Sequence, residues 1–415
     1  METKTPIKNG WAQHKIKDFG AVSTGTTPST KNLDYYGGPY KLISPSDLTD
    51  SKYIFTAHKF ITQQGLTVAR TLPKNAVLVG CIGNVGKIGI TTDEISAFNQ
   101  QINAIVCNAN YNADFVYYLL RYQRPLLESK AAKVTLPILN KNNFENIEFE
   151  VPDLPEQKSI ARVLTVVQEA IAGQEELITK LKELKRGMMQ YLFTHGTKGE
   201  KTKITELGEM PESWSVEVLK SLVPDIEYGV SQAIPKTQPK HGYKIVSTAD
   251  ITKSGILLYE QLRYIDVKDS QAEKLRLKNG DVLFNWRNSL DHIGKSAIYD
   301  HNDEHVIFAS FILRLRCDEK KAHNRFVRDL MNFYREQGVF SKLARRAVNQ
   351  ANYNRNEIYV LQIPAPSYNE QVEIAGVIES VNKRIEFAQK KLSEYQCLFK
   401  TLLHELMSGE RRVKF

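Results

Sequence analysis

Cysteine is scarce in this sequence, and no metal-binding pattern accompanies it. The four cysteines form no C-x-x-C pair and have no histidine at zinc-site spacing: Cys81, Cys107, Cys317 and Cys397. Free cysteine packs as a small hydrophobic residue, so we interpret all four as buried, reduced thiols. His58, His241 and His404 have no acidic or thiol partner at ligand spacing either. We therefore expect no metal ion in this chain.

Long apolar runs are also missing. No stretch approaches the roughly 18 consecutive apolar residues that a membrane helix needs. The start, Met1-Glu-Thr-Lys-Thr-Pro, lacks the apolar segment of a secretory signal. We therefore expect a cytoplasmic protein that contacts no membrane. The length of 415 residues, with 42% hydrophobic and 25% charged residues, indicates a globular chain of two or three domains.

Nucleotide-binding motifs are incomplete. The segment 80–89 resembles the phosphate-binding loop G-x-x-x-x-G-K-[ST], but Cys81 replaces the first glycine and Ile88 replaces the magnesium-binding hydroxyl. A second Gly-Lys-Ser, at 294–296, has Ser289 in place of the first glycine. We expect no nucleotide site and interpret the glycines as a place where the backbone approaches a phosphate or crosses a sheet.

Catalytic motifs fail as well. Pro152-Asp153 with Glu183-Leu-Lys185 mimics a nuclease P-D…E-x-K pattern, but its second half falls inside a predicted helix, far from Asp153. Pro224-Asp225 with Asp266-Val-Lys268 is a looser match. The segment [DN]-P-P-[FYW], with which amino-methylating enzymes hold the target nitrogen, is absent. No catalytic residue is predicted.

The chain is basic and repeats itself once. Its net charge is +9, which is compatible with a polyanionic partner such as nucleic acid. Five segments recur in the same order at offsets that grow from 203 to 214 residues. The five pairs are Trp11 with Trp214, 40–48 with 243–251, 86–90 with 294–298, 98–107 with 308–317, and 151–161 with 365–375. The sequence thus predicts a tandem duplication of a unit of roughly 205 residues.

Each copy is predicted to contain a globular part and a long helix. Short apolar runs at 76–79, 102–106, 281–284 and 311–315 indicate strands, with helices around 114–122 and 325–340. The fold class is therefore α/β (α+β). We divide the chain into a globular part at 1–150, a helix at 151–200, a second globular part at 201–362 and a second helix at 363–415.

The two helices carry heptad seams, with apolar residues at alternating steps of four and three. Gln174 and Lys185 are the two exceptions in the first helix. A seam of roughly 35 to 38 residues is about 55 Å long. Matched seams favour pairing of the two helices over burial of each one separately. Connectivity then makes the pair antiparallel, with two similar globular parts related by a pseudo-twofold axis.

This layout resembles the specificity subunit of type I restriction-modification systems. The resemblance covers the whole chain and is carried by the duplicated Pro-x-x-x-Glu-Gln-x-x-Ile-Ala helix starts at 152–161 and 366–375 and by the Gly-Lys turns at 86 and 294. It implies that each globular part is a target recognition domain for one half of a bipartite DNA site. It also implies that the helices set the spacing between the halves and hold the partner subunits.

The resemblance further implies a set of partners. They are double-stranded DNA, two methylation (modification) subunits and the restriction/translocation subunits, on which S-adenosylmethionine, ATP and magnesium are expected. No cofactor is expected in this chain, which is predicted to be a non-catalytic subunit. Two alternatives stay open: a DNA enzyme such as a fused methylase-nuclease, and a coiled-coil scaffold with no DNA role.

Polar loop residues supply the candidate DNA contacts, because Asn and Gln pair with adenine edges, Arg and Lys with guanine, and all of them with phosphate. The candidates in the first copy are Lys31, Tyr35, Asn84, Lys87, Asn99, Gln100, Gln101, Lys133, Thr135, Asn140, Lys141 and Asn142. Those in the second copy are Asn285, Arg287, Asn288, His292, Lys295, Arg345, Arg346, Asn349, Gln350, Asn352, Asn354 and Arg355.

An apolar band near the end of each helix is wider than one partner helix can cover. Its members are Met188, Met189, Tyr191, Leu192 and Phe193 in the first helix, and Leu402, Leu403, Leu406 and Met407 in the second. We interpret the band as a docking surface for the methylation subunits. Packing against the neighbouring globular part is the alternative.

Overall fold

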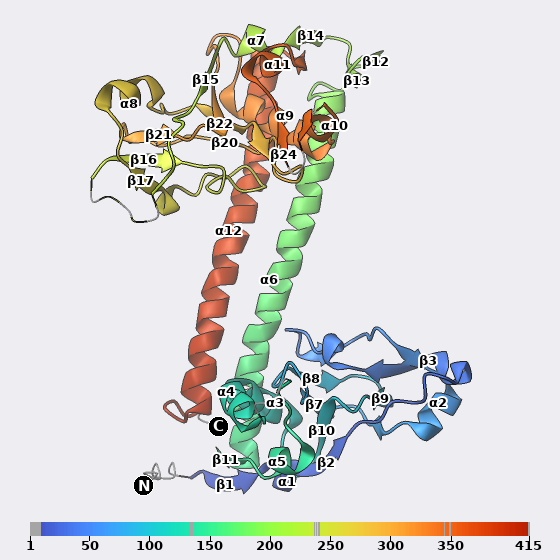
Figure 1. Cartoon of the computed structure of the whole chain (residues 1–415). Helices are drawn as coiled ribbons and strands as arrows, with labels where there is room; N and C mark the ends of the chain where they lie inside the picture. The colour runs from blue at the N-terminus through green and yellow to red at the C-terminus, as the bar shows by residue number, and fades with distance from the viewer. Residues whose placement is uncertain are drawn as a thin grey trace. The chain divides into compact units, whose positions relative to one another are not determined.

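The structure is a computed structural model that divides into two compact units (Figure 1). It describes residues 10–132, 136–235, 237, 239, 241–343, 345–347 and 350–413, and for 343, 345–347, 350 and 351 it describes the backbone alone. Unit 1 comprises Met1–Glu176 and Gln389–Phe415, and unit 2 comprises Leu177–Ala388. Whereas the sequence-based division cuts the chain near the helix ends, the compact units cut each long helix near its middle.

Unit 1 is built on two sheets. The order in the first is β2 (Gly20–Thr24), β10 (Ile102–Cys107), β7 (Val77–Gly80), β8 (Ile88–Thr91) and β4 (Tyr53–Ile54). The order in the second is β5 (Phe60–Ile61), β3 (Tyr36–Ile43), β9 (Ser96–Phe98) and β6 (Thr71–Leu72). β1 (Ala12–Lys15) pairs with β11 (Glu148–Val151). The short helices are α1 (Ile16–Phe19), α2 (Gln63–Val68), α3 (Ala113–Tyr122), α4 (Arg124–Lys130) and α5 (Lys141–Glu145).

Unit 2 has a four-stranded sheet in the order β15 (Asp225–Tyr228), β22 (Ile312–Arg316), β18 (Val282–Asn285) and β20 (Ser296–Ile298). Two three-stranded sheets follow the orders β17 (Arg263–Ile265), β16 (Tyr243–Val246), β21 (Val306–Phe308), and β19 (Arg287–Asn288), β24 (Gln350–Asn352), β23 (Arg345–Ala347). The remaining pairs are β12 (Thr202–Thr205) with β13 (Gly208–Pro211) and β14 (Ser215–Val218) with β25 (Gln362–Ala365). Its short helices are α7 (Leu219–Leu222), α8 (Asp269–Leu275), α9 (Asn324–Glu336), α10 (Val339–Leu343) and α11 (Arg355–Tyr359).

The two units repeat the same strand pairing. In each, one central strand lies between two antiparallel neighbours: β10 between β2 and β7, and β22 between β15 and β18. Each unit also has an equivalent parallel pair of strands, β3 with β9 in unit 1 and β16 with β21 in unit 2. The internal repeat in the sequence is therefore a repeat of structure, and the predicted α/β (α+β) fold class is confirmed.

The long helices are α6 (Leu154–His195) and α12 (Tyr368–Met407). The apolar residues of both heptad seams are buried or half-buried. Ile160, Leu164 and Ile374 are fully buried, and no apolar seam residue is among the exposed hydrophobic side chains. Of the two exceptions, Gln174 is buried and Lys185 is half-buried. Burial lowers the pKa of Lys185, because desolvation disfavours its charged form.

Each unit contains the beginning of one long helix and the end of the other. In unit 1, Arg412, just beyond α12, donates from Nη2 to Glu156 Oε2 at 2.7 Å, at the start of α6. In unit 2, Lys198, just beyond α6, lies 3.1 Å from Glu370 at the start of α12. The two pairs are equivalent at the 214-residue offset. The helix segments within each unit therefore run antiparallel, as predicted.

The glutamine of each Glu-Gln helix start ties its helix to the globular part. Gln157 donates to Pro152 O at 3.0 Å and accepts from the backbone N–H of Asn112 at 3.0 Å, where α3 begins. Gln371 donates to Pro366 O at 3.1 Å and accepts from the N–H of His323 at 2.9 Å, where α9 begins. Both glutamines are buried. This repeated motif is therefore a structural joint.

Candidate nucleic-acid interface

Three loops of unit 1 that are distant in sequence meet beside the central sheet. The backbone N–H of Cys81, at the start of the β7–β8 loop, donates to Gln101 O at 2.8 Å, in the turn before β10. Cys81 O accepts from the N–H of Leu139 at 2.8 Å, in the segment before α5. We call this group of segments, 81–87, 99–101 and 136–142, the unit 1 loop surface.

The turn before β10 is fixed by its own carboxamides. Asn99 Oδ1 accepts from the N–H of Gln101 at 3.1 Å, and Asn99 Nδ2 donates to Gln101 Oε1 at 3.3 Å. Gln100 Oε1 accepts from the hydroxyl of Thr27 at 2.5 Å. The amide nitrogens of Gln100 and Gln101 thus belong to side chains whose orientation is already set, which favours selective hydrogen bonding.

The equivalent loops meet in unit 2. The N–H of Trp286, in the β18–β20 loop, donates to Phe311 O at 3.3 Å, in the turn before β22. Trp286 O accepts from the N–H of Tyr353 at 3.0 Å, in the segment before α11. Arg287 pairs with Asn352 through β19 and β24. We call the segments 286–293, 309–311 and 350–355 the unit 2 loop surface.

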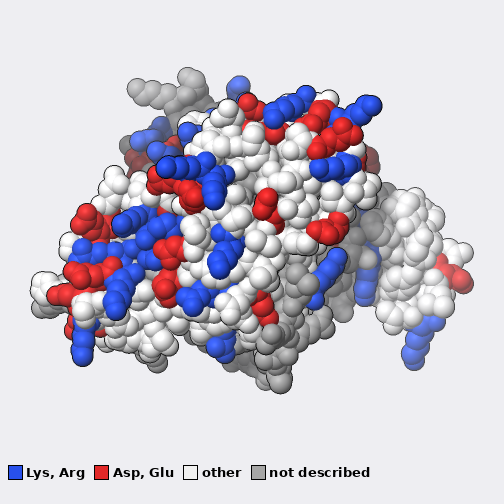
Figure 2. Space-filling model, turned by 90° about the horizontal axis from the view of Figure 1, so that it is seen from above, with Lys and Arg blue, Asp and Glu red and all other residues white. Residues whose placement is uncertain are grey.

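Positive charge surrounds part of the unit 2 loop surface. The pKa of His292 is lowered, first by desolvation and then by Lys295, Lys253 and Arg335, which outnumber the opposing Asp291. Charge is less one-sided elsewhere: on the face drawn in Figure 2, Lys and Arg side chains are interspersed with Asp and Glu. The net charge of the chain therefore does not translate into a continuous basic band on that face.

Comparison with known families identifies both copies. A family model described as the type I restriction modification DNA specificity domain matches residues 8–183 and again residues 227–395. The chain belongs to this specificity family. The chain is thus a specificity subunit of a type I restriction-modification system, with a DNA-recognition domain in each copy.

Relatives align along the whole length. The chain is 26% identical to the type I restriction enzyme MjaVIII specificity subunit of Methanocaldococcus jannaschii, over 98% of this chain and 94% of that one. A match to the putative MjaX specificity subunit of the same organism is 34% identical but covers 46% of this chain and 47% of the relative. The crystal structure of an S subunit from M. genitalium shares the fold, with a TM-score of 0.62 at 12% identity over 98% of both chains.

The structure of the specificity subunit places most predicted contact residues at the surface. The exposed ones are Lys31, Asn84, Gln100, Asn140, Lys141, Asn142 and Asn354. The half-exposed ones are Tyr35, Lys87, Asn99, Gln101, Arg287, Asn288, His292, Asn352 and Arg355. Among the described residues, no hydrogen bond or ion pair joins Lys31 or Tyr35 to the unit 1 loop surface. Exposure makes DNA contact feasible for the others but leaves it a prediction.

Two predicted contacts lie in the interior of unit 2 and are withdrawn. Asn285 is fully buried, and its Nδ2 donates to His292 O at 3.1 Å. Lys295 is 5% exposed, and its ammonium donates to Thr248 O at 2.7 Å and to Ile251 O at 2.5 Å. Their polar groups hold backbone carbonyls together, so they cannot reach a ligand in this structure.

Two other candidates have a structural role for their oxygen. Asn140 Oδ1 accepts from the N–H of Asn143 and caps α5, while Asn354 Oδ1 accepts from the N–H of Glu357 and caps α11. Each capping bond orients its carboxamide, whose amide nitrogen can still donate to a base. Lys133, Thr135 and Asn349 lie outside the described residues, and for Arg345, Arg346 and Gln350 only the backbone is described, in β23 and β24.

Burial divides the predicted docking band. Met189, Leu192 and Phe193 pack in the core of unit 2, and Leu406 and Met407 pack in the core of unit 1, so the alternative of intramolecular packing is correct for these five. Tyr191 is 57% exposed, and Met188, Leu402 and Leu403 are half-exposed. Of the four cysteines that we expected to be buried, Cys81 is buried, Cys107 and Cys317 are half-buried, and Cys397 is exposed on α12.

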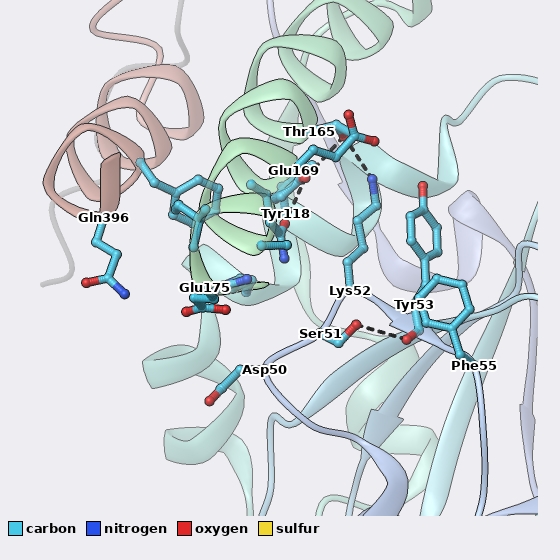
Figure 3. Close-up of a pocket in the computed structure, with 15 residues that line it drawn as sticks. Asp50, Ser51, Lys52, Tyr53, Phe55, Tyr118, Thr165, Glu169, Glu175 and Gln396 are labelled. Atoms are coloured by element: carbon cyan, nitrogen blue, oxygen red, sulfur yellow. Dashed lines mark hydrogen bonds between the residues drawn. The ribbon is translucent and has the colours of Figure 1, made fainter. Parts of the chain in front are cut away.

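A hollow of about 720 Å³ in unit 1 lies where β4 faces α6 and α12. Figure 3 shows Lys52 extending toward Thr165 and Glu169 at one side of it, with Asp50 and Glu175 at another. Lys52 is buried and donates to Thr165 Oγ1 at 2.8 Å. The ammonium group of Lys52 is therefore bonded to other residues of unit 1. In the part of the chain that is described, no three His, Cys, Asp or Glu side chains are grouped to hold a metal ion.

No helix of the described residues is long and apolar enough to cross a membrane. Glu183 and Lys185, from the nuclease-like pattern, lie well inside α6, and Asp153 precedes that helix.

Sequence reasoning missed Trp286 and Phe311, which organise the unit 2 loop surface. Aligning the two copies puts Phe311 opposite Gln101, and that comparison could have revealed it.

Proposed function

We propose that each unit of this specificity subunit reads one half of a bipartite DNA target. The single observation that carries the proposal is the repeated loop surface. The same three chain segments meet in both units, and they present carboxamides and cations suited to base edges and phosphates. Equivalent surfaces with different side chains are what reading two different half-sites requires.

We further propose that α6 and α12 set the distance between the two half-sites and hold two methylation subunits. Val166, Leu177, Leu184 and Tyr191 are exposed on α6, and Phe387 and Leu398 are exposed on α12. Leu184 and Leu398 are equivalent at the 214-residue offset, so each helix offers a leucine at the same place in the repeat. Such paired apolar sites suit two copies of one partner.

The chemistry is assigned to partner subunits. We propose that this chain methylates and cleaves nothing by itself, and that S-adenosylmethionine, ATP and magnesium bind to the modification and restriction/translocation subunits. The complex would work on double-stranded DNA in the cytoplasm. Incubating the purified chain alone with labelled duplex, S-adenosylmethionine and magnesium tests this assignment. Methyl transfer or cleavage by the lone chain would contradict it.

Exchange of one copy tests the bipartite reading. Residues 201–362 are replaced by the corresponding region of a family member with a different target, and the sequences methylated in the cell are mapped. We expect one half of the methylated sequence to change while the other half and the spacer length stay the same. The matched control replaces residues 1–150 instead and should change the opposite half.

The exchange has two outcomes that would overturn the proposal. A change in both halves of the methylated sequence after a single exchange would mean that one unit reads the entire target. Unchanged methylation after both exchanges, with normal complex assembly in a size-exclusion experiment, would favour the scaffold alternative.

A further inference from the structure

An aromatic side chain stands at the centre of the unit 2 loop surface. Phe311 lies in the turn between β21 and β22 and is 42% exposed, whereas Phe308 at the end of β21 and Ile312 at the start of β22 are fully buried. A single exposed apolar side chain is ordinary on a protein surface, so the groups around Phe311 decide whether the ring has a function.

The turn that carries Phe311 is held rigidly from below. Trp286 Nε1 donates to Ser310 O at 2.6 Å, and the Trp286 backbone N–H donates to Phe311 O. The indole packs edge-on against Tyr228, with ring centroids 5.3 Å apart, and against Phe311 at 6.4 Å. Phe311 is therefore presented in a fixed position, which lowers the entropic cost of binding.

A cation covers one face of the ring. The guanidinium carbon of Arg287 lies 5.0 Å from the centroid of Phe311. Arg287 sits on β19, opposite Asn352 of β24, so a carboxamide lies in register with the cation. The ring thus shares its surface with groups that bind guanine, adenine or phosphate. That combination suits a polar, anionic partner with small apolar groups on it.

Unit 1 has a different residue at the same place. The repeat aligns Phe308–Ile312 with Phe98–Ile102, so Gln101 corresponds to Phe311. The carboxamide of Gln101 is oriented by Asn99 and is suited to an adenine edge. The only base with an apolar group exposed in the major groove is thymine, through its 5-methyl group.

We propose that Phe311 contacts a thymine methyl group in the half-site read by unit 2, and that Arg287 binds the adjacent base or phosphate. The proposal rests on the proposed function, because it assigns a specific contact within one of the two recognition surfaces. Because Trp286 holds the turn that carries Phe311 in place, we expect the ring to meet the edge of a base and not to insert between base pairs.

The test uses the complex of the full chain with its modification subunit and duplexes that carry the target found by methylation mapping. Each thymine of the unit 2 half-site is replaced in turn by deoxyuridine, which lacks only the methyl group. We expect one replacement to weaken binding of the wild-type complex about fourfold, the effect of removing one buried methyl group. The same replacement should leave binding by Phe311→Ala unchanged.

Two further variants separate contact from folding. Phe311→Leu keeps an apolar group and should retain most of the discrimination between thymine and deoxyuridine. Phe311→Gln introduces the residue of unit 1 and should lose it while preserving the turn. Phe55→Ala, at a 71% exposed aromatic position outside both loop surfaces, is the matched control and should bind and discriminate as the wild type does.

The inference and the proposed function fail in distinguishable ways. Equal affinity of the wild type for all deoxyuridine duplexes, or the same loss with Phe311→Ala as with the wild type, would overturn the contact and leave bipartite reading intact. Absence of any sequence preference in the wild-type complex would overturn the proposed function itself.

Discussion

Asp303 shows how one carboxylate in unit 2 depends on its hydrogen bonds. It accepts from the hydroxyl of Tyr259 at 2.6 Å, from the ammonium of Lys244 at 3.1 Å and from the N–H of His305 at 2.9 Å. Burial raises the pKa of Asp303, but these donors outweigh it and lower the pKa to about 2. The ionised form is therefore part of the folded state.

We predict that Asp303→Asn lowers the free energy of unfolding at pH 7 by about 1 kcal/mol. The pKa shift alone would give about twice as much, but the side chain is 28% exposed and solvent screens it. Because the folded pKa lies below the unfolded value, this stabilisation is complete above about pH 4 and disappears as the pH falls through about 2. Urea unfolding at pH 7 and pH 2.5, followed by tryptophan fluorescence, measures the difference.

Asp300→Asn is the control for this prediction, since Asp300 is half-exposed and lies 3.6 Å from His301. It should change stability little at either pH. An equal loss from both substitutions at pH 7, or a loss from Asp303→Asn that is as large at pH 2.5 as at pH 7, would contradict the assignment.

At this scale, the residue types at the surface were predictable and their availability was not. Asn285 and Lys295 occupy a polar loop that looks equivalent to its neighbours, yet both are buried among backbone carbonyls. Phe311 shows the opposite error, because an aromatic residue next to a strand suggests core. Side-chain orientation at a turn depends on contacts across 20 or more residues, such as Trp286 with Ser310, which periodicity does not reveal.

Among the elements, the joints formed by Gln157 and Gln371 connect each long helix to its globular part. Gln371 makes hydrogen bonds to Pro366 O, Lys321 O and the N–H of His323. Removal of the carboxamide leaves these buried backbone groups without partners. We predict that Gln371→Ala destabilises unit 2 by about 2–3 kcal/mol.

Hydrogen exchange measures this effect where it occurs. Gln371→Ala should speed exchange in α9, because Gln371 accepts a hydrogen bond from the backbone N–H of His323, where α9 begins. Gln157→Ala should speed exchange in α3, because Gln157 accepts from the N–H of Asn112, where α3 begins. The two variants are matched controls for each other. Uniform acceleration of exchange over both units by either variant would show that the joints are not local.

Elements with strong periodicity were predicted well. The runs at 102–106 and 281–284 became β10 and β18, and the seams became α6 and α12, because one apolar face per element leaves few alternatives. The pairing of β19 with β24 was not predicted. Its segments are polar and far apart in sequence, so they carry no hydrophobic pattern that would indicate a strand.

For the molecule as a whole, the excess of positive charge should control binding to DNA. Each phosphate contact releases counterions, so affinity should fall steeply as salt rises. We predict that replacing Arg345 and Arg346 together by alanine weakens binding and reduces the slope of log affinity against log salt by about two. Binding titrations with duplex DNA at several salt concentrations between about 50 and about 200 mM measure the slope.

Lys390 and Lys391 on α12 provide the control for this prediction, because they contribute the same charge outside both loop surfaces. Replacing both by alanine should leave the slope nearly unchanged. A similar reduction from both pairs would attribute the salt dependence to total charge, and an unchanged slope for Arg345 and Arg346 would place that segment off the DNA.

The divergence between Gln101 and Phe311 has a consequence for genomes. If each unit reads one half-site, as proposed, surfaces that differ at this turn favour different bases, so we expect an asymmetric target that the complex binds in one orientation. Each site then fixes one orientation of the assembly on the chromosome. A duplication that kept its backbone and changed a few turn residues would thereby convert a symmetric ancestor into a directional marker.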